Sequence, residues 1–149
     1  MKSQWLTKLA EKPKPRTYPT FKEEFGTEKY VEIYMTHAQR SLYAQFRCGI
    51  LPLSIETGRY TNTSAEERVC TTCSNGDVED EFHFVLVCEA YREDRNLLFE
   101  KLNVEAPNIL HMTFPEKFQF LLNNGSLYLP KFISNIWEKC QKVLYKTNT

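Results

Sequence analysis

Apolar residues recur at three- and four-residue steps through most of the sequence, which is the period of one face of an α-helix. The longest such pattern runs from residue 27 to about residue 46 and predicts one amphipathic helix or a close pair of helices. Shorter patterns predict further helices over residues 3–11, over residues 89–102, from Thr113 onward and from Pro130 onward. No run with the two-residue period of a strand is convincing, so we expect a mainly α, helical single domain.

Several of these helices have a recognisable inner face or a recognisable end. Gly49 is expected to end the longest one, and Thr113 with Glu116 has the form of a capping box. Cys48 and Cys140 lie in apolar helical patterns and are expected in the core. The predicted core positions of the longest pattern are Val31, Tyr34, Met35, Ala38, Leu42, Tyr43 and Phe46. Those of the last helix are Ile133, Ile136, Trp137, Cys140 and Leu144.

The beginning of the sequence differs in composition from the rest. Three prolines within eight residues favour an extended segment that cannot continue a helix. We therefore divide the chain into a basic, proline-rich arm over residues 1–19 and a helical domain over residues 20–149. The arm contains Lys12, Lys14 and Arg16, which could contact nucleic acid, although basic tracts are more often only solvated.

Charge is balanced over the whole chain but unevenly distributed along it. The 149 residues carry nineteen basic and nineteen acidic side chains. Residues 61–100 hold three basic side chains against ten acidic ones, so both flanks are basic. Because non-specific nucleic-acid affinity comes mainly from Lys and Arg that neutralise phosphates, contact with nucleic acid would fall to the flanks. No apolar run approaches the length of a membrane span, so no membrane partner is expected.

The acidic middle of the chain carries a metal-ligand pattern, C-x2-C-x9-H-x4-C, formed by Cys70, Cys73, His83 and Cys88. Four ligands are what a closed, tetrahedral structural zinc site takes, whereas a catalytic zinc usually keeps one position for water or substrate. We therefore expect one structural Zn²⁺ in a CCHC zinc knuckle over residues 68–95. A redox pair is a weaker alternative, because a His and a Cys follow the first two cysteines at finger-like spacing. A disulfide framework is also weaker, because the five cysteines are odd in number and no secretory signal precedes them. An intracellular protein, nuclear or cytoplasmic and not secreted, is expected.

The residues between the ligands predict how the ligands meet. Asn75 and Gly76 supply a turn, and Asp77 is expected to cap the helix that presents the histidine. In a regular α-helix, two side chains five positions apart point in directions that differ by roughly 140° around the helix axis. This helix should therefore end or tighten near Val87, so that the last cysteine reaches the same metal. Residues 64–67 have the form of a capping box and predict a helical turn that leads into the first cysteine.

The ligand pattern is accompanied by further distinctive segments, which are residues 47–53, 55–60, 67–70 and 78–88. Together they resemble the zinc-binding domain that lies C-terminal to the polymerase in reverse transcriptases of non-LTR retrotransposons, above all LINE-like, jockey-type elements. The resemblance is specific over residues 41–95 and faint outside them. It implies a structural zinc on the same four ligands, in an accessory module that helps the parent polymerase engage its nucleic acid.

The sequence departs from that family where polymerase activity is concerned. The family's polymerase holds two metal ions on paired aspartates, and no two aspartates are adjacent in this sequence. Nor do 149 residues leave room for fingers, palm and endonuclease. We therefore expect a non-catalytic module without a small-molecule substrate, either a polymerase-less fragment or a copy adopted by the host.

Two functions are compatible with these observations. The first is assistance in RNA or DNA binding through the basic flanks. Arg59 and Arg68 are the basic residues nearest the knuckle, and they could contact phosphate or instead pair with its acidic helix. The second is a structural or protein-interaction module whose partner meets the acidic surface of the knuckle. A zinc hydrolase is the least favoured class, because four protein ligands close the site.

Overall fold

The computed structural model describes residues 28–124 and 127–147. This part of the chain is mainly helical and has no strand beyond one isolated bridge, which confirms the predicted fold class. The helix predicted over residues 3–11 and the arm over residues 1–19, with Lys12, Lys14 and Arg16, lie outside the described residues.

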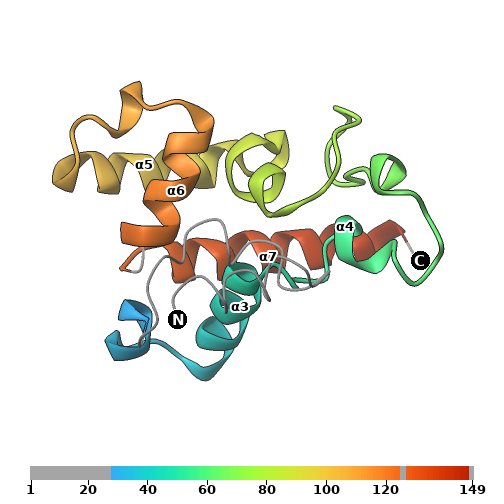
Figure 1. The fold of residues 1–149 in the computed structure, drawn as a ribbon, viewed down its shortest axis with the longest axis horizontal. Helices are drawn as coiled ribbons and strands as arrows, with labels where there is room; N and C mark the ends of the chain where they lie inside the picture. The colour runs from blue at the N-terminus through green and yellow to red at the C-terminus, as the bar shows by residue number, and fades with distance from the viewer. Residues whose placement is uncertain (1–27, 125–126, 148–149) are drawn as a thin grey trace, which may run out of the picture.

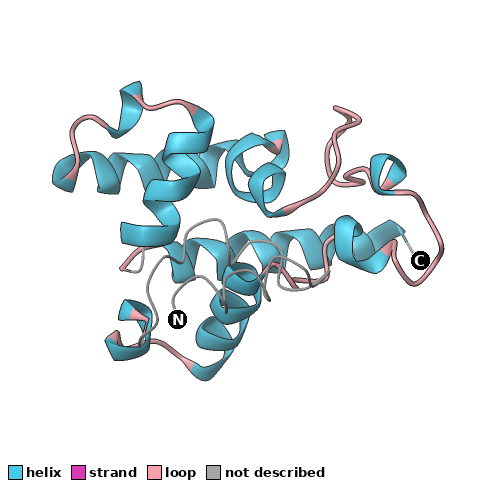
Figure 2. Cartoon of the chain, in the orientation of Figure 1, coloured by secondary structure: helices cyan, strands magenta, loops and turns pink. Residues whose placement is uncertain are grey.

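Helix α7 crosses the centre of the molecule, and α3 and α5 both pack against it (Figures 1 and 2). None of the described helices is both long enough and apolar enough to cross a membrane. In chain order the elements are the 3-10 turn η1 (Lys29–Glu32), α3 (His37–Cys48), α4 (Ser54–Thr57), the 3-10 turn η2 (Ala65–Glu67), the π-helical turn η3 (His83–Val87), the 3-10 turn η4 (Glu89–Tyr91), α5 (Arg92–Glu105), the 3-10 turn η5 (Ile109–His111), α6 (Phe114–Asn124) and α7 (Leu129–Thr147).

The longest predicted pattern folds as a close pair of elements, η1 and α3, because a capping box starts a new helix within it. The hydroxyl of Thr36 accepts the backbone N–H of Gln39 at 3.1 Å, and the Gln39 side chain accepts the N–H of Thr36 at 3.2 Å. Gly49 ends α3 as predicted, in the left-handed conformation with φ of 70°. The local sequence therefore determines both ends of α3.

The core predictions are confirmed at the centre of the molecule and fail at its edges. The predicted positions that are buried are Tyr43, Phe46, Ile133, Ile136 and Cys140. The predicted positions that are exposed are Val31, Tyr34, Ala38 and Leu144, with Tyr34 at 94%. Val31 and Tyr34 precede the cap of α3, so the helical period on which their prediction rested does not extend to them. Cys48 is half-buried rather than fully in the core.

A buried arginine connects α3 with two other parts of the chain. Arg47 is 4% exposed, and its guanidinium donates to the carbonyl of Leu122 in α6 and to the carboxylate of Glu28, the latter at 2.8 Å. The same group lies over the rings of Tyr30 and Tyr43, 5.3 and 5.6 Å from their centroids. One side chain thus joins α3, α6 and the residues that precede α3.

The capping box predicted at the start of α6 is confirmed. The N–H of Thr113 donates to the Glu116 carboxylate at 2.8 Å, and the N–H of Glu116 donates to the Thr113 hydroxyl at 3.4 Å. Leu121 and Leu122 at the other end of α6 are buried. Phe114 is exposed, so α6 contributes to the core mainly through its last turns.

Candidate metal centre

The first two cysteine ligands lie on a narrow ribbon of backbone between η2 and η3. Val69 and Val78 form an antiparallel bridge, and the N–H of Cys70 donates to the carbonyl of Asp77 at 2.8 Å. Gly76 has φ of 77°, which only glycine adopts readily, and this lets the chain reverse where the sequence predicted a turn. The ribbon holds the first ligand beside the segment that carries the third.

The helix that presents His83 begins later than the sequence predicted, and its cap is Asp80 rather than Asp77. The Asp80 carboxylate accepts the backbone N–H of His83 at 2.8 Å. Glu79 lies outside this helix, because its N–H donates to the carbonyl of Arg68 at 3.0 Å and keeps it in the ribbon. Pairing across the ribbon has therefore overridden the local signal for an earlier helix start.

The helix ends at Val87, as predicted. Its last turn is wider than a regular α-helical turn, although the sequence predicted tightening as one way for the two ligands to meet. The N–H of Cys88 donates to the carbonyl of His83 at 2.8 Å, a bond across five residues that defines a π-helical turn. A wider turn brings residues five positions apart closer to one side of the helix than a regular α-helix does. His83 and Cys88 can therefore face the same point.

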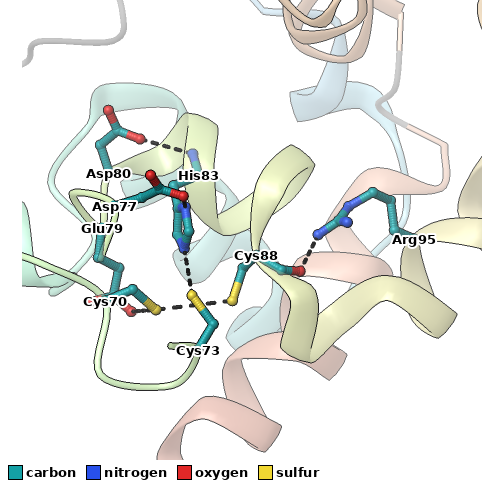
Figure 3. Close-up of polar contacts among 8 residues, drawn as sticks. All are labelled: Cys70, Cys73, Asp77, Glu79, Asp80, His83, Cys88 and Arg95. Atoms are coloured by element: carbon teal, nitrogen blue, oxygen red, sulfur yellow. Dashed lines mark hydrogen bonds and ion pairs between the residues drawn. The ribbon is translucent and has the colours of Figure 1, made fainter. Parts of the chain in front are cut away.

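The four predicted ligands converge, and they could hold a metal ion (Figure 3). Their ligand atoms all lie within 4.8 Å of one another. The Sγ of Cys73 is 3.4 Å from Nε2 of His83, and the sulfurs of Cys70 and Cys88 are 4.0 Å apart. Cys70, His83 and Cys88 are buried, while Cys73 is half-buried. This convergence confirms the grouping that the spacing predicted.

The electrostatics of the cluster favour a cation. The hydrogen bond from Cys88 lowers the pKa of Cys70 to about 3 and raises the pKa of Cys88 above its ordinary value. A metal ion bound to both sulfurs would displace the protons that they hold. Burial acts to lower the pKa of His83, but its hydrogen bond with Cys70 and the neighbouring negative charges outweigh burial and raise that pKa.

Two acidic side chains lie directly behind the ligands. A carboxylate oxygen of Asp77 is 3.7 Å from Nδ1 of His83, on the side of the ring away from Cys73 (Figure 3). Such a partner favours binding of a metal through Nε2. Glu79 is buried, with one oxygen 3.7 Å from the Cys70 sulfur and the other accepting the backbone and hydroxyl hydrogens of Ser54 at 2.7 and 2.6 Å. Glu79 thereby ties the ribbon to the start of α4, and burial raises its pKa.

Arg95 of α5 fixes the C-terminal end of the ligand helix. Its Nε donates to the carbonyl of Val85 at 2.9 Å, and its Nη2 donates to the carbonyl of Cys88 (Figure 3). No ligand motif includes this residue, and the sequence carried no signal for its role. Arg95 links the metal centre to a helix that packs on α7.

We expect Arg95→Met to weaken metal binding by about 10–100-fold, the usual cost of losing a residue that orients ligands. The reason is that the Cys88 carbonyl loses its donor and the π-helical turn is no longer anchored. Competition with a chromophoric chelator measures the affinity. The matched control is Arg92→Met on the same helix, because Arg92 is exposed and pairs with the side chain of Glu89 and not with the backbone of the ligand helix. Equal affinities for the two variants would contradict this role.

Metal affinity is expected to fall as the pH is lowered, because Cys and His ligands must lose their protons to bind. The pKa of His83 is raised, so protons compete at a higher pH than they would for an ordinary imidazole near about 6.5. Chelator competition at about pH 6 and about pH 8, on either side of that ordinary value, measures the effect. His37→Ala and His111→Ala should leave the profile unchanged. A flat profile in the wild-type chain would refute the assignment of His83 as a ligand.

The two arginines nearest the knuckle bind the loop around α4 and not the ligand helix. Arg68 is half-buried and donates to the carbonyls of Thr63 and Ile55, both at 2.9 Å. Arg59 lies 3.5 Å from the carboxylate of Glu56. The predicted turn that leads into Cys70 is present as η2, although its expected capping bond from Ser64 is not formed. Phosphate contact by Arg59 or Arg68 stays a prediction.

The fifth cysteine lies beside the ligand turn but is not part of the cluster. Cys140 of α7 is buried, and its sulfur is 4.0 Å from the hydroxyl of Thr72, which stands between Cys70 and Cys73. Burial raises the pKa of the Cys140 thiol. The ligand turn therefore rests on α7 through Thr72.

Comparison with known proteins gives no family assignment. A scan of the sequence against protein-family models, a search of curated proteins and a search of solved structures found no match. The chemistry of this chain is therefore argued from its own residues.

Proposed function

We propose that this chain is a non-catalytic zinc-binding module in which one Zn²⁺ holds residues 68–95 in shape. The observation that carries the proposal is the convergence of the ligand atoms of Cys70, Cys73, His83 and Cys88 within 4.8 Å of one another. Three sulfurs and one imidazole are a ligand set typical of structural zinc. The four donors would complete a tetrahedral shell and leave no position for a substrate.

The donor types favour zinc over the other common ions. Ca²⁺ and Mg²⁺ prefer oxygen ligands, whereas thiolate-rich sites select Zn²⁺, Cu(I) or iron–sulfur clusters. A single histidine among three cysteines suits a four-coordinate zinc site, and three thiolates around Zn²⁺ leave a net charge of about −1.

Metal analysis of the purified chain tests the proposal. We expect one zinc per chain, with the metal lost from Cys73→Ser and His83→Ala and kept by Cys48→Ser. Cys48 is half-buried in α3 and lies outside the ligand cluster, so it controls for loss of any cysteine. A wild-type chain that binds no zinc, or a Cys73→Ser variant that binds it as tightly, would contradict the proposal.

We further propose that the module assists RNA or DNA binding, with the basic flanks making the phosphate contacts. The support is the resemblance of residues 41–95 to the zinc-binding domain of non-LTR reverse transcriptases and the excess of Lys and Arg on both sides of the acidic middle. The chain would catalyse no reaction, and it would act by increasing the affinity for RNA or DNA.

Titration of single-stranded RNA and DNA at several salt concentrations tests this second proposal. Binding should weaken steeply with salt, and replacing Lys12, Lys14 and Arg16 by Ala should reduce the salt slope by about 0.7 for each phosphate that is no longer neutralised. Arg92→Ala is a suitable control, because Arg92 lies in the acidic middle of the chain and pairs with Glu89. Absence of binding at low salt would rule out nucleic-acid binding by the isolated chain.

The competing function is a protein-interaction module, and the exposed charge of the knuckle favours it. Glu66, Glu67 and Asp77 are exposed near the ligands, whereas Glu79 and Glu81 are buried. A basic protein segment would complement this surface. If nucleic acid fails to bind while a lysine-rich peptide binds in a salt-dependent way, this function replaces the previous one.

A further inference from the structure

The three sulfur ligands differ in how easily a small reagent can reach them. Cys70 and Cys88 are 5% and 0% exposed, whereas Cys73 is half-buried. A thiolate is the form of cysteine that reacts with a peroxide, and the peroxide must be able to reach its sulfur. Cys73 is therefore the sulfur of the cluster that a peroxide meets first.

The two partners available to an oxidised Cys73 lie in different elements. Cys88 belongs to the π-helical turn, because its N–H donates to the His83 carbonyl at 2.8 Å, and its own carbonyl accepts a bond from Arg95. Cys70 lies in the ribbon with Cys73, where its N–H donates to the Asp77 carbonyl at 2.8 Å, and two residues between cysteines is a spacing at which disulfides form and break in redox proteins. A bond to Cys70 requires movement within the ribbon and leaves the π-helical turn in place, whereas a bond to Cys88 would disrupt that turn.

We propose that the metal centre is a peroxide-sensitive switch in which oxidation joins Cys73 to Cys70 and releases the zinc. The proposal rests on the zinc site proposed above. It assigns a regulatory role to the same ligands, with hydrogen peroxide as the oxidant. Cys140 is not the partner, because it belongs to α7 and lies outside the group of four residues whose ligand atoms are within 4.8 Å of one another.

The chemistry balances as a two-electron oxidation in two steps. The Cys73 thiolate attacks one oxygen of hydrogen peroxide, the O–O bond breaks, and sulfenic acid forms while hydroxide leaves and takes a proton to become water. The Cys70 thiolate then attacks the sulfenic sulfur, the S–S bond forms, and the second oxygen leaves as hydroxide and is protonated to water. Two thiolates have been oxidised, one peroxide has been reduced, and Zn²⁺ is freed.

The structural consequence follows from the number of ligands that remain. His83 and Cys88 alone cannot complete a four-coordinate shell, so zinc leaves the site. The ribbon from Arg68 to Glu79 then loses its attachment to the ligand helix through the metal, while the contact of Asp77 with Nδ1 of His83 remains. Reduction of the disulfide and return of zinc would restore the fold.

The test treats the zinc-loaded full chain with equimolar and excess hydrogen peroxide and follows zinc release with a chromophoric chelator. Peptide mapping under non-reducing conditions identifies the disulfide. We expect release of the bound zinc together with a Cys70–Cys73 disulfide, and recovery of zinc binding after dithiothreitol and added Zn²⁺. Cys48→Ser and Cys140→Ser keep all four ligands and should behave like the wild type.

A second variant isolates the reachable sulfur without reducing the number of ligands. Cys73→His keeps four zinc ligands, and its zinc should leave at least about tenfold more slowly in peroxide, because thiolate access sets the rate. Zinc that stays bound to the wild type in excess peroxide would overturn the switch while leaving the zinc site intact. A disulfide that contains Cys48, Cys88 or Cys140, or release with overoxidised sulfurs and no disulfide, would also overturn it. If the wild type binds no zinc, both the zinc-site proposal and the switch proposal are wrong.

Discussion

Removal of the metal with a chelator is expected to unfold residues 68–95 while the outer helices keep part of their structure. Structural zinc contributes apparent free energies on the order of 10 kcal/mol in finger peptides, a large sum for a segment of this size. The segment has little regular structure of its own, since it depends on one isolated bridge, the π-helical turn η3 and the short turn η4 before α5 begins. The helices α3 and α5 both pack on α7, through contacts that do not involve the ligands.

Circular dichroism and limited proteolysis before and after chelation measure this loss. Cys73→Ser and His83→Ala should reproduce the effect of the chelator, and protease cleavage should concentrate between Arg68 and Arg95. His111→Ala is the matched control for His83→Ala, because His111 lies in η5 and is exposed. Unchanged melting together with unchanged protease sensitivity in both ligand variants would refute a structural role for the metal.

Replacement of Arg47 by Met is expected to lower the free energy of unfolding by about 3–5 kcal/mol, the range seen when one partner of a buried ion pair is removed. The substitution removes the donor to the Leu122 carbonyl and the partner of Glu28. It also removes the cation from its contacts with the rings of Tyr30 and Tyr43. The ring contact of Phe46 with Phe118 would still join α3 to α6.

Thermal melting of the zinc-loaded chain measures this effect, and a fall in Tm of roughly 10 °C corresponds to it for a chain of this length. Arg40→Met is the matched control on the same helix, because Arg40 donates to the carbonyls of Val31 and Ile33 at a more exposed position. The control should lower Tm by clearly less than Arg47→Met does. Equal effects would show that Arg47 acts as an ordinary surface residue.

The ligand set could be predicted from the sequence because metal binding by a knuckle depends on spacing within one short segment. Cys70 and Cys73 are separated by a single turn, and His83 and Cys88 follow at a distance that a ribbon and one helix can span. No long-range packing is needed to bring such ligands together. Their convergence is therefore a property of the local chain.

The details around the ligands could not be predicted because other parts of the chain decide them. The start of the ligand helix moves from Asp77 to Asp80 because the ribbon pairs Val78 and Glu79 with the backbone of residues 68–70. Glu79 is drawn inward by Ser54, twenty-five positions earlier in the sequence. Helical periodicity and capping patterns depend only on residues close in sequence. They therefore carry no information about contacts with distant residues such as Ser54.

The sequence by itself determined the helical class, the end of α3 at Gly49, the start of α6, the central core positions and the four ligands, because each depends on residues within a few turns of one another. Tertiary structure alone decided the anchoring of Cys88 by Arg95 and the burial of Arg47 between α3 and α6. It also drew Glu79 out of the predicted helix and buried it against Ser54. Burial and hydrogen bonding depend on which segments meet in space, and a pattern along the chain carries only the local part of that information.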